Sequence, residues 1–224
     1  MSTFVDGLVV CRACAHRFPA EIADAVHVST RRELRDAILA GELHRFMCPR
    51  CGGSTTVEKL FAYTDFDRFH WFVVVPGAEL PFVDDWERFA EETFAATMRS
   101  HCPPMVRDEW APRMQRRVVF GLAALREKLM AADAGLDDRV LEGMKLGVLL
   151  RGGILPSAGE HLHLVGVDGV SLWLCHARGS GTVSFSVPRS WYVEAEAAFA
   201  RAEGAQFGGL VVDYRAALVE RGAV

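Results

Sequence analysis

Two short stretches, Cys11-Arg-Ala-Cys14 and Cys48-Pro-Arg-Cys51, decide the fold that we expect for the first part of this chain. In each stretch two residues separate the cysteines, so one tight turn can direct both thiolates at a single metal ion. Two such turns brought together supply four sulfurs in a tetrahedron, which is the arrangement that a structural zinc ion prefers. We therefore predict that Cys11, Cys14, Cys48 and Cys51 bind one structural zinc ion per chain. Because a closed site of this kind has no open coordination position, the pattern predicts no catalytic residue and no other cofactor.

The residues around the two turns support metal binding. Pro49 stiffens the second turn, and Gly52 allows the backbone to double back and point amide donors at sulfur. In the first turn Ala15 stands where a glycine would adopt the required conformation more easily. The alternative is that the cysteines are buried thiols or a redox pair, but a redox Cys-x-x-Cys normally occurs once, in a βαβ setting. Two pairs therefore favour a metal.

Composition narrows the function only a little. The chain has 224 residues, half of them apolar, and a formal net charge of −4. Acidic and basic residues are balanced in each third of the chain, so the bulk charge does not favour a nucleic-acid partner. The longest apolar run, residues 71–75, is far below the roughly twenty residues of a membrane span. The start of the chain lacks a secretory signal, and paired cysteines favour metal over disulfide, so we expect a reducing cytoplasm. Arginine far outnumbers lysine, which is typical of a GC-rich bacterial genome.

Local signals predict an α+β protein whose first part is a zinc-ribbon-like β module with an inserted helix. Residues 8–10 are predicted to form a short strand before the first cysteine turn. Thr30 and Glu33 have the spacing of a capping box, and the helix that they begin should end at Gly41. This helix accounts for the gap between the cysteine pairs, which is longer than the 15–20 or so residues of a compact zinc ribbon. Strands are expected at about 55–63 and 69–75.

The rest of the chain is predicted to contain a central helical segment and a small C-terminal α+β portion. Apolar residues recur at helical spacing from about 83 to 150, with the clearest stripe between Met114 and Leu129. Asp137 is placed as the N-cap of a third helix. Residues 170–175 and 182–187 are rich in strand formers, and an amphipathic helix is expected from 188 to about 203. We expect a metal-binding module over residues 1–78 and a second portion over residues 79–224, with the packing of both into one domain as the alternative.

The cysteine turns also carry a resemblance. The two turns, the long gap, the phrase Ile38-Leu-Ala-Gly-Glu-Leu43 and the run Cys48-Pro-Arg-Cys-Gly52 resemble the CpXC family of bacterial and archaeal proteins, over about residues 9–76. Arg12 departs from the Cys-Pro start that this family has in its first turn. The resemblance implies that the four matching cysteines bind a metal. It also implies that the chain belongs to a family without a characterised function. It implies no substrate.

Other residue patterns allow chemistry but specify none. His161 and His163 fall on the same side of a predicted strand, and Glu160 or His176 could join them at a second metal site. The ordinary interpretation is the polar face of a strand. We therefore predict a non-enzymatic, cytoplasmic, zinc-binding protein that acts as a protein-interaction or scaffold module. The alternatives are a nucleic-acid-associated zinc-ribbon regulator and an enzyme with a hydrolase-type site near His161 and His163.

Overall fold

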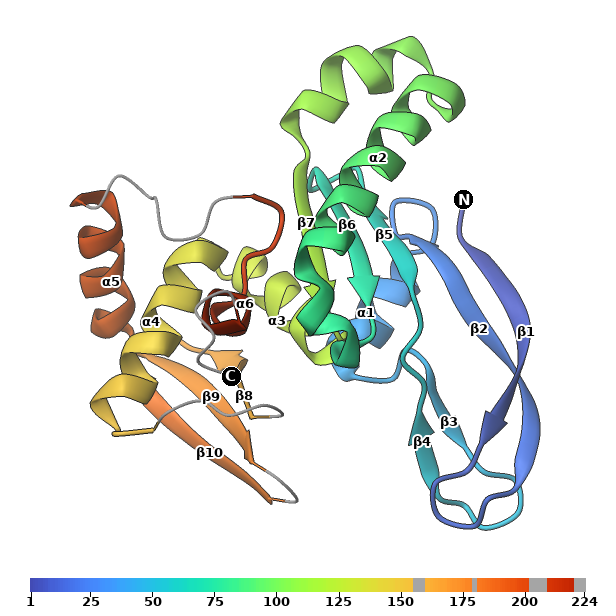
Figure 1. The fold of residues 1–224 in the computed structure, drawn as a ribbon, viewed down its shortest axis with the longest axis horizontal. Helices are drawn as coiled ribbons and strands as arrows, with labels where there is room; N and C mark the ends of the chain where they lie inside the picture. Colours follow the sequence, from blue (N-terminus) through green and yellow to red (C-terminus); the bar gives the residue numbers. More distant parts are fainter. Residues whose placement is uncertain (155–159, 179–180, 202–208, 220–224) are drawn as a thin grey trace. The chain divides into compact units, whose positions relative to one another are not determined.

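The structure, a computed structural model, describes residues 1–154, 160–178, 181–201 and 209–219 (Figure 1). The protein is mixed α+β, with three sheets among these residues. By its internal contacts the chain divides into two units, Met1–Leu122 and Ala123–Val224. No helix in the described part of the chain is both long and apolar enough to cross a membrane.

Unit 1 is built on a five-stranded mixed sheet in the order β1-β2-β5-β6-β7. Strands β1 and β2 are antiparallel, as are β5 and β6, whereas β2–β5 and β6–β7 are parallel pairs. The short strands β3 and β4 form a separate antiparallel hairpin. The elements of unit 1 are β1 (Thr3–Val10), β2 (Arg17–His27), α1 (Arg32–Ala40), β3 (Arg45–Met47), β4 (Ser54–Thr56), β5 (Phe61–Asp65), β6 (His70–Val75), a 3₁₀ helix (Gly77–Phe82), α2 (Val83–His101), a π-helical turn (Val106–Trp110), a 3₁₀ turn (Ala111–Arg113) and β7 (Gln115–Phe120).

Helices cover both faces of this sheet, which explains why all six residues of β6 are buried. On one face Trp71 of β6 packs edge-on against Phe94 of α2, with ring centroids 5.0 Å apart. On the other face Phe72 stacks on Tyr63 of β5. A strand buried on both faces has an uninterrupted apolar sequence, as β6 has from Trp71 onward.

Asp65 fixes α1 to the second face. Its side chain is fully buried at the end of β5 and accepts hydrogen bonds from the amides of Asp67 (3.0 Å) and Arg68 (3.2 Å). The same carboxylate lies 3.1 Å from the Arg68 guanidinium and 3.9 Å from that of Arg35 on α1. One buried carboxylate therefore joins the β5–β6 turn to the helix.

Unit 2 has an antiparallel three-stranded sheet in the order β10-β9-β8. One face of the sheet carries Leu162, Leu164, Leu172 and Leu174, which form a single core with residues of α4, α5 and α6. The elements that follow β7 are α3 (Leu122–Asp133), α4 (Asp138–Arg151), β8 (His161–Val167), β9 (Ser171–Arg178), β10 (Gly181–Pro188), α5 (Arg189–Arg201) and α6 (Tyr214–Val219).

Side chains satisfy the outer edge of β8. The amide of Leu162 donates to the hydroxyl of Tyr214 (3.0 Å), and the amide of Leu164 donates to the carboxylate of Glu127. An edge strand otherwise presents unpaired backbone groups that invite pairing with another chain. Residues of α3 and α6 thus close this side of the sheet.

Several predicted elements are confirmed. The inserted helix is α1, and it ends at Gly41 in the left-handed conformation (φ 72°). Helix α4 begins where expected, because the Asp137 side chain accepts a hydrogen bond from the amide of Arg139. The predicted strands at 170–175 and 182–187 are β9 and β10, and the predicted terminal helix is α5.

The prediction of continuous helix through residues 114–122 is wrong. Residues Gln115–Phe120 form β7, which pairs in parallel with β6, and α3 begins only at Leu122. The run Val118-Val119-Phe120 has strand-forming side chains, and burial beside β6 outweighed the helical spacing of the stripe. For the same reason unit 1 extends to Leu122 and not to residue 78. Strand β2 and helix α6 were not predicted.

The capping box is also wrong. The Thr30 hydroxyl donates to the carbonyl of His27 (2.9 Å), and Glu33 pairs with the Arg31 side chain, while α1 has no side-chain cap at its N-terminus. The N-cap position of α1 is Arg31, so Thr30 lies one residue too early to cap the helix.

Replacing Asp65 with alanine tests its role as the tie between α1 and the β5–β6 turn. We expect a loss of about 3 kcal/mol or more in the free energy of unfolding, because the change removes a buried carboxylate from the arginines that it pairs with. Chemical denaturation measures this loss. The matched control is Asp67→Ala, whose side chain is 56% exposed and should cost well under about 1 kcal/mol. Equal costs for the two variants contradict the assignment.

Candidate metal centre

The four predicted sulfurs converge at one end of unit 1. Each of Cys11, Cys14, Cys48 and Cys51 has its sulfur within 4.8 Å of the other three. The shortest separations are 3.6 Å between Cys11 and Cys51 and 3.7 Å between Cys14 and Cys48. A tetrahedral zinc ion with zinc–sulfur bonds of about 2.3 Å requires sulfurs about 3.8 Å apart. The cluster therefore has the dimensions of a four-thiolate zinc site, and its soft ligands suit zinc.

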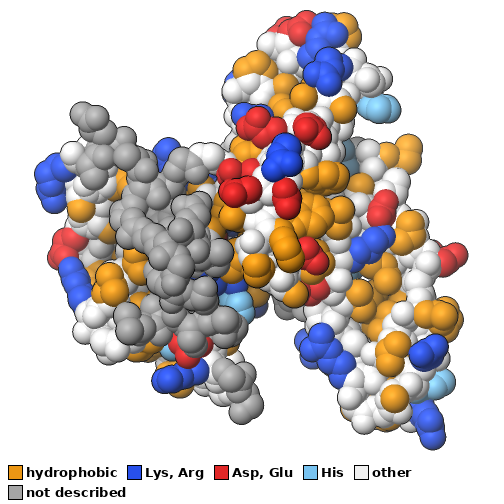
Figure 2. Space-filling model, in the orientation of Figure 1, with side chains coloured by type: hydrophobic (Ala, Val, Ile, Leu, Met, Phe, Trp, Pro, Cys, Tyr) orange, Lys and Arg blue, Asp and Glu red, His pale blue; other side chains and the backbone are white. Residues whose placement is uncertain are grey.

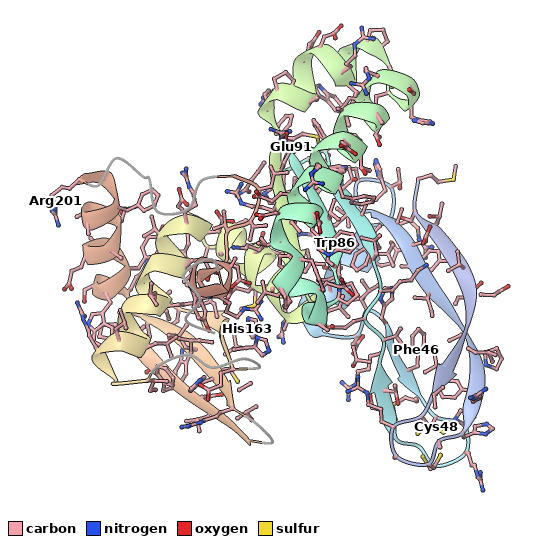
Figure 3. The ribbon with its side chains drawn as sticks, viewed as in Figure 1. Phe46, Cys48, Trp86, Glu91, His163 and Arg201 are labelled. Carbon is pink, nitrogen blue, oxygen red and sulfur yellow. The ribbon has the colours of Figure 1, made fainter. Side chains whose placement is uncertain are left out.

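Two turns of the same design position these sulfurs. In the first turn, between β1 and β2, the Cys11 amide donates to the His16 carbonyl (2.9 Å) and the Ala15 amide donates to the Cys11 carbonyl (2.9 Å). In the second turn, between β3 and β4, the Cys48 amide donates to the Gly53 carbonyl (2.8 Å) and the Gly52 amide donates to the Cys48 carbonyl (2.9 Å). Figure 3 shows Cys48 at the tip of these hairpins, beside other sulfur atoms.

The residue after the second cysteine is left-handed in both turns. Gly52 has φ 70°, and Ala15, at the equivalent place, has φ 57°. Ala15 thus occupies a left-handed position that a glycine would adopt more easily, as its place in the cysteine turn predicts. A left-handed alanine costs roughly 1–2 kcal/mol relative to a glycine.

Backbone amides stabilise negative charge on the cluster. Burial raises the pKa of the Cys11 thiol, but hydrogen bonds from the backbone of Cys14 and Ala13 and from neighbouring thiols outweigh it and lower this pKa to about 6. The Gly53 amide lies 3.4 Å from the Cys51 sulfur and acts as a donor to it, which lowers the pKa of Cys51, but hydrogen bonds with the neighbouring thiols and burial outweigh this and raise the pKa to about 12. Donors of this kind fix the orientation of metal-binding thiolates and stabilise their charge.

Apolar packing supports the cluster on one side only. Cys11 and Cys48 are buried together with Val9 and Phe18, while Cys51 is exposed. Across the two hairpins the amide of Arg12 donates to the Thr55 hydroxyl (3.2 Å). Such limited packing leaves most of the cohesion of this end to the thiol cluster. We call residues 8–18 and 44–56 the metal end.

The other candidate residues do not assemble into a comparable site. Among the described residues, only the four cysteines form a cluster of three or more metal-ligating side chains. His161 and His163 stack at 5.7 Å on one face of β8. Glu160 lies instead beside His176 (3.4 Å), which shares the opposite face with Leu162. Strand alternation thus separates the suggested third ligand from the histidine pair.

Sequence reasoning missed a buried charge network in unit 2. The Lys145 ammonium lies 2.7 Å from Glu127 and 2.8 Å from Glu142, and Lys128 lies 3.3 Å from Asp138. All five side chains are almost fully buried. The signal in the sequence was a set of ionisable residues next to apolar core positions of α3 and α4, such as Glu127 between Leu125 and Leu129.

Burial and nearby positive charges determine the protonation of His163. Burial, together with the positive charges of Lys145 and Arg215, lowers the pKa of His163 to about 3. The imidazole is therefore neutral at pH 7 and stays neutral in mildly acidic solution. Its neighbour His161 contacts the guanidinium of Arg215 through Nδ1, which occupies one of the two ring nitrogens that can bind a metal ion.

The fold and the cluster define an α+β protein with a paired-cysteine metal centre. A family model described as CpXC protein matches residues 9–145, which is more than half of the chain. The chain therefore belongs to the CpXC family, and the resemblance expected from the cysteine turns is confirmed. No curated protein and no solved structure shows a significant match to the chain.

The two equivalent turn positions provide a paired test of the turn geometry. We expect Ala15→Gly to stabilise unit 1 by about 1 kcal/mol, because it relieves the left-handed alanine. Gly52→Ala should destabilise unit 1 by about 1–2 kcal/mol, purely through the backbone, since a Cβ at Gly52 would meet nothing within 4 Å. Denaturant unfolding at saturating zinc measures both. Changes of the same sign would contradict a common turn design.

The neutral His163 makes stability depend on pH. Its pKa is lower in the folded protein than the ordinary value near 6.5, so the unfolded chain takes up a proton first as the pH falls. We expect the wild type to lose about 2 kcal/mol between pH 6.5 and pH 5 relative to His163→Gln. His101→Gln, at an exposed position of α2, is the control and should leave the pH dependence unchanged. Parallel curves for the wild type and His163→Gln contradict this assignment.

Proposed function

We propose that this protein is a zinc-binding, non-enzymatic interaction or scaffold module of the cytoplasm, and that its metal is structural. The observation that carries the proposal is the convergence of four sulfurs at the spacing of a tetrahedral zinc site. A zinc ion held by Cys11, Cys14, Cys48 and Cys51 has its coordination positions filled by protein. Such an ion supplies folding free energy and a fixed surface, with no position left for a reacting water.

The position of the cluster supports a structural role for the metal. The β3–β4 hairpin has only three residues per strand, and a hairpin of this length is marginal by itself in water. The turn of the β1–β2 hairpin supplies the other two thiolates. One ion bound by both turns joins the two hairpins, in the manner of a zinc ribbon. Structural zinc contributes on the order of 10 kcal/mol to small modules.

The alternative from the enzyme class needs a second metal or catalytic site near His161 and His163. A second equivalent of tightly bound metal per chain, lost in the variant with both His161→Ala and His163→Ala, would favour that alternative. The Arg215 contact to His161 and the separation of Glu160 from the histidine pair support the non-enzymatic proposal instead.

Metal content and chelation test the proposal. We expect one equivalent of zinc per chain by elemental analysis, and loss of that zinc in Cys48→Ser. Removing zinc with a strong chelator should lower thermal stability and expose amides of the metal end to hydrogen exchange before those of unit 2. The matched control is Cys102→Ser, which changes a cysteine outside the cluster and should keep the zinc. Unchanged stability after complete removal of zinc would sink the structural role.

A further inference from the structure

The segments that carry the cysteine cluster also carry exposed arginines. Four exposed arginines lie within the metal end, and carboxylates are absent from its sequence, which contains neither aspartate nor glutamate. The nearest acidic residues along the chain are Asp6, Glu21, Glu42 and Glu58, all outside it. On the face in view, Figure 2 shows blue side chains and no red ones around this end of unit 1. The arginines are Arg12, Arg17, Arg45 and Arg50.

Both hairpins contribute to this charge. Arg12 and Arg50 lie inside the two cysteine turns, while Arg17 begins β2 and Arg45 begins β3. The convergence of the sulfurs therefore gathers the arginines as well. Arg45 donates to the Ser54 hydroxyl (2.8 Å), and in the described part of the chain no carboxylate forms an ion pair with any of the four. Their charges are thus available to a ligand.

The charge remains positive when the metal is counted. A zinc ion bound by four thiolates carries a formal charge of −2, and four guanidinium groups carry +4. The metal end therefore keeps a net charge of about +2 with His16 neutral, in a chain whose formal net charge is −4. Charge segregated in this way is the electrostatic footprint of a polyanion-binding surface.

We propose that the metal end binds the phosphate backbone of a nucleic acid, which rests on the proposed function because zinc holds the two hairpins together. Guanidinium groups bind phosphate oxygens through paired hydrogen bonds. The hairpins narrow to a projecting tip, which can approach a sugar-phosphate backbone without a groove to receive it (Figure 1). A partner protein, expected from the sequence, would instead need an acidic surface matched to this tip.

The near-equal numbers of acidic and basic residues in the sequence give no indication of this positively charged surface. The acidic residues of the first third lie outside the metal end, in positions such as Asp24 in β2 and Asp36 in α1. A count of charges along the chain combines these acidic residues with the arginines of the metal end, whereas the fold keeps the two groups apart. The bulk charge of the chain is acidic, whereas the charge of the metal end is the kind that attracts a polyanion.

Salt-dependent binding of labelled 20-nucleotide single strands and 20-base-pair duplexes to the zinc-loaded full chain tests the proposal. Four phosphate contacts predict that log K falls with log salt with a slope of up to about 3–4 for duplex. Arg12→Gln with Arg50→Gln should lower that slope by about 2 and weaken binding for every sequence alike. The matched control, Arg32→Gln with Arg88→Gln, removes the same charge from exposed positions of α1 and α2 and should keep the wild-type slope.

The outcomes separate this proposal from the structural role of zinc. Full zinc content and wild-type stability with no binding at 50 mM salt overturn the nucleic-acid proposal and leave the metal proposal intact. Poly-glutamate that competes as well as DNA of equal charge overturns it in favour of an acidic protein partner. A slope that falls equally in both double variants overturns the assignment to the metal end. Loss of zinc in the variant Arg12→Gln with Arg50→Gln would contradict the placement of these two arginines as surface groups. The single variant Arg17→Gln then decides whether loss of charge alone lowers the salt dependence of binding.

Discussion

The constraint on which unit 1 depends is the close approach of four cysteine sulfurs. Sulfurs less than 5 Å apart repel one another as thiolates, and only a few apolar side chains, such as Val9 and Phe18, pack behind them. A cation bound by the four sulfurs removes that repulsion and holds the two hairpins together. The turn hydrogen bonds and the left-handed Ala15 and Gly52 hold the sulfurs in this position.

Away from the metal end, buried carboxylates fix the backbone by accepting hydrogen bonds from its amides. Asp65 accepts from two turn amides, Glu127 accepts from the amide of Leu164, and Glu142 accepts from that of Tyr214 (3.1 Å). In each case a basic side chain lies beside the carboxylate and offsets the cost of burying its charge. The protein therefore joins several of its elements through buried charged groups.

The sequence predicts the cysteine cluster well because ligand spacing is a local property, and four thiols of this pattern have few other uses. It also predicts α1, α4 and the β9–β10 hairpin, whose boundaries depend on nearby residues such as Gly41 and Asp137. It fails for β7, because pairing with β6 depends on residues far away along the chain. The arginine-rich surface and the environment of His163 could not be predicted for the same reason, because each is created by bringing distant segments together.

The parallel pairing of β6 with β7 has a consequence for synthesis. The last strand of the unit 1 sheet spans Gln115–Phe120, so this sheet stays incomplete on the ribosome until the nascent chain has passed residue 120. All four cysteines are translated earlier, by residue 51. Metal capture by the two cysteine turns can therefore precede closure of the sheet, because every ligand is on the chain before β7 exists to pair with β6.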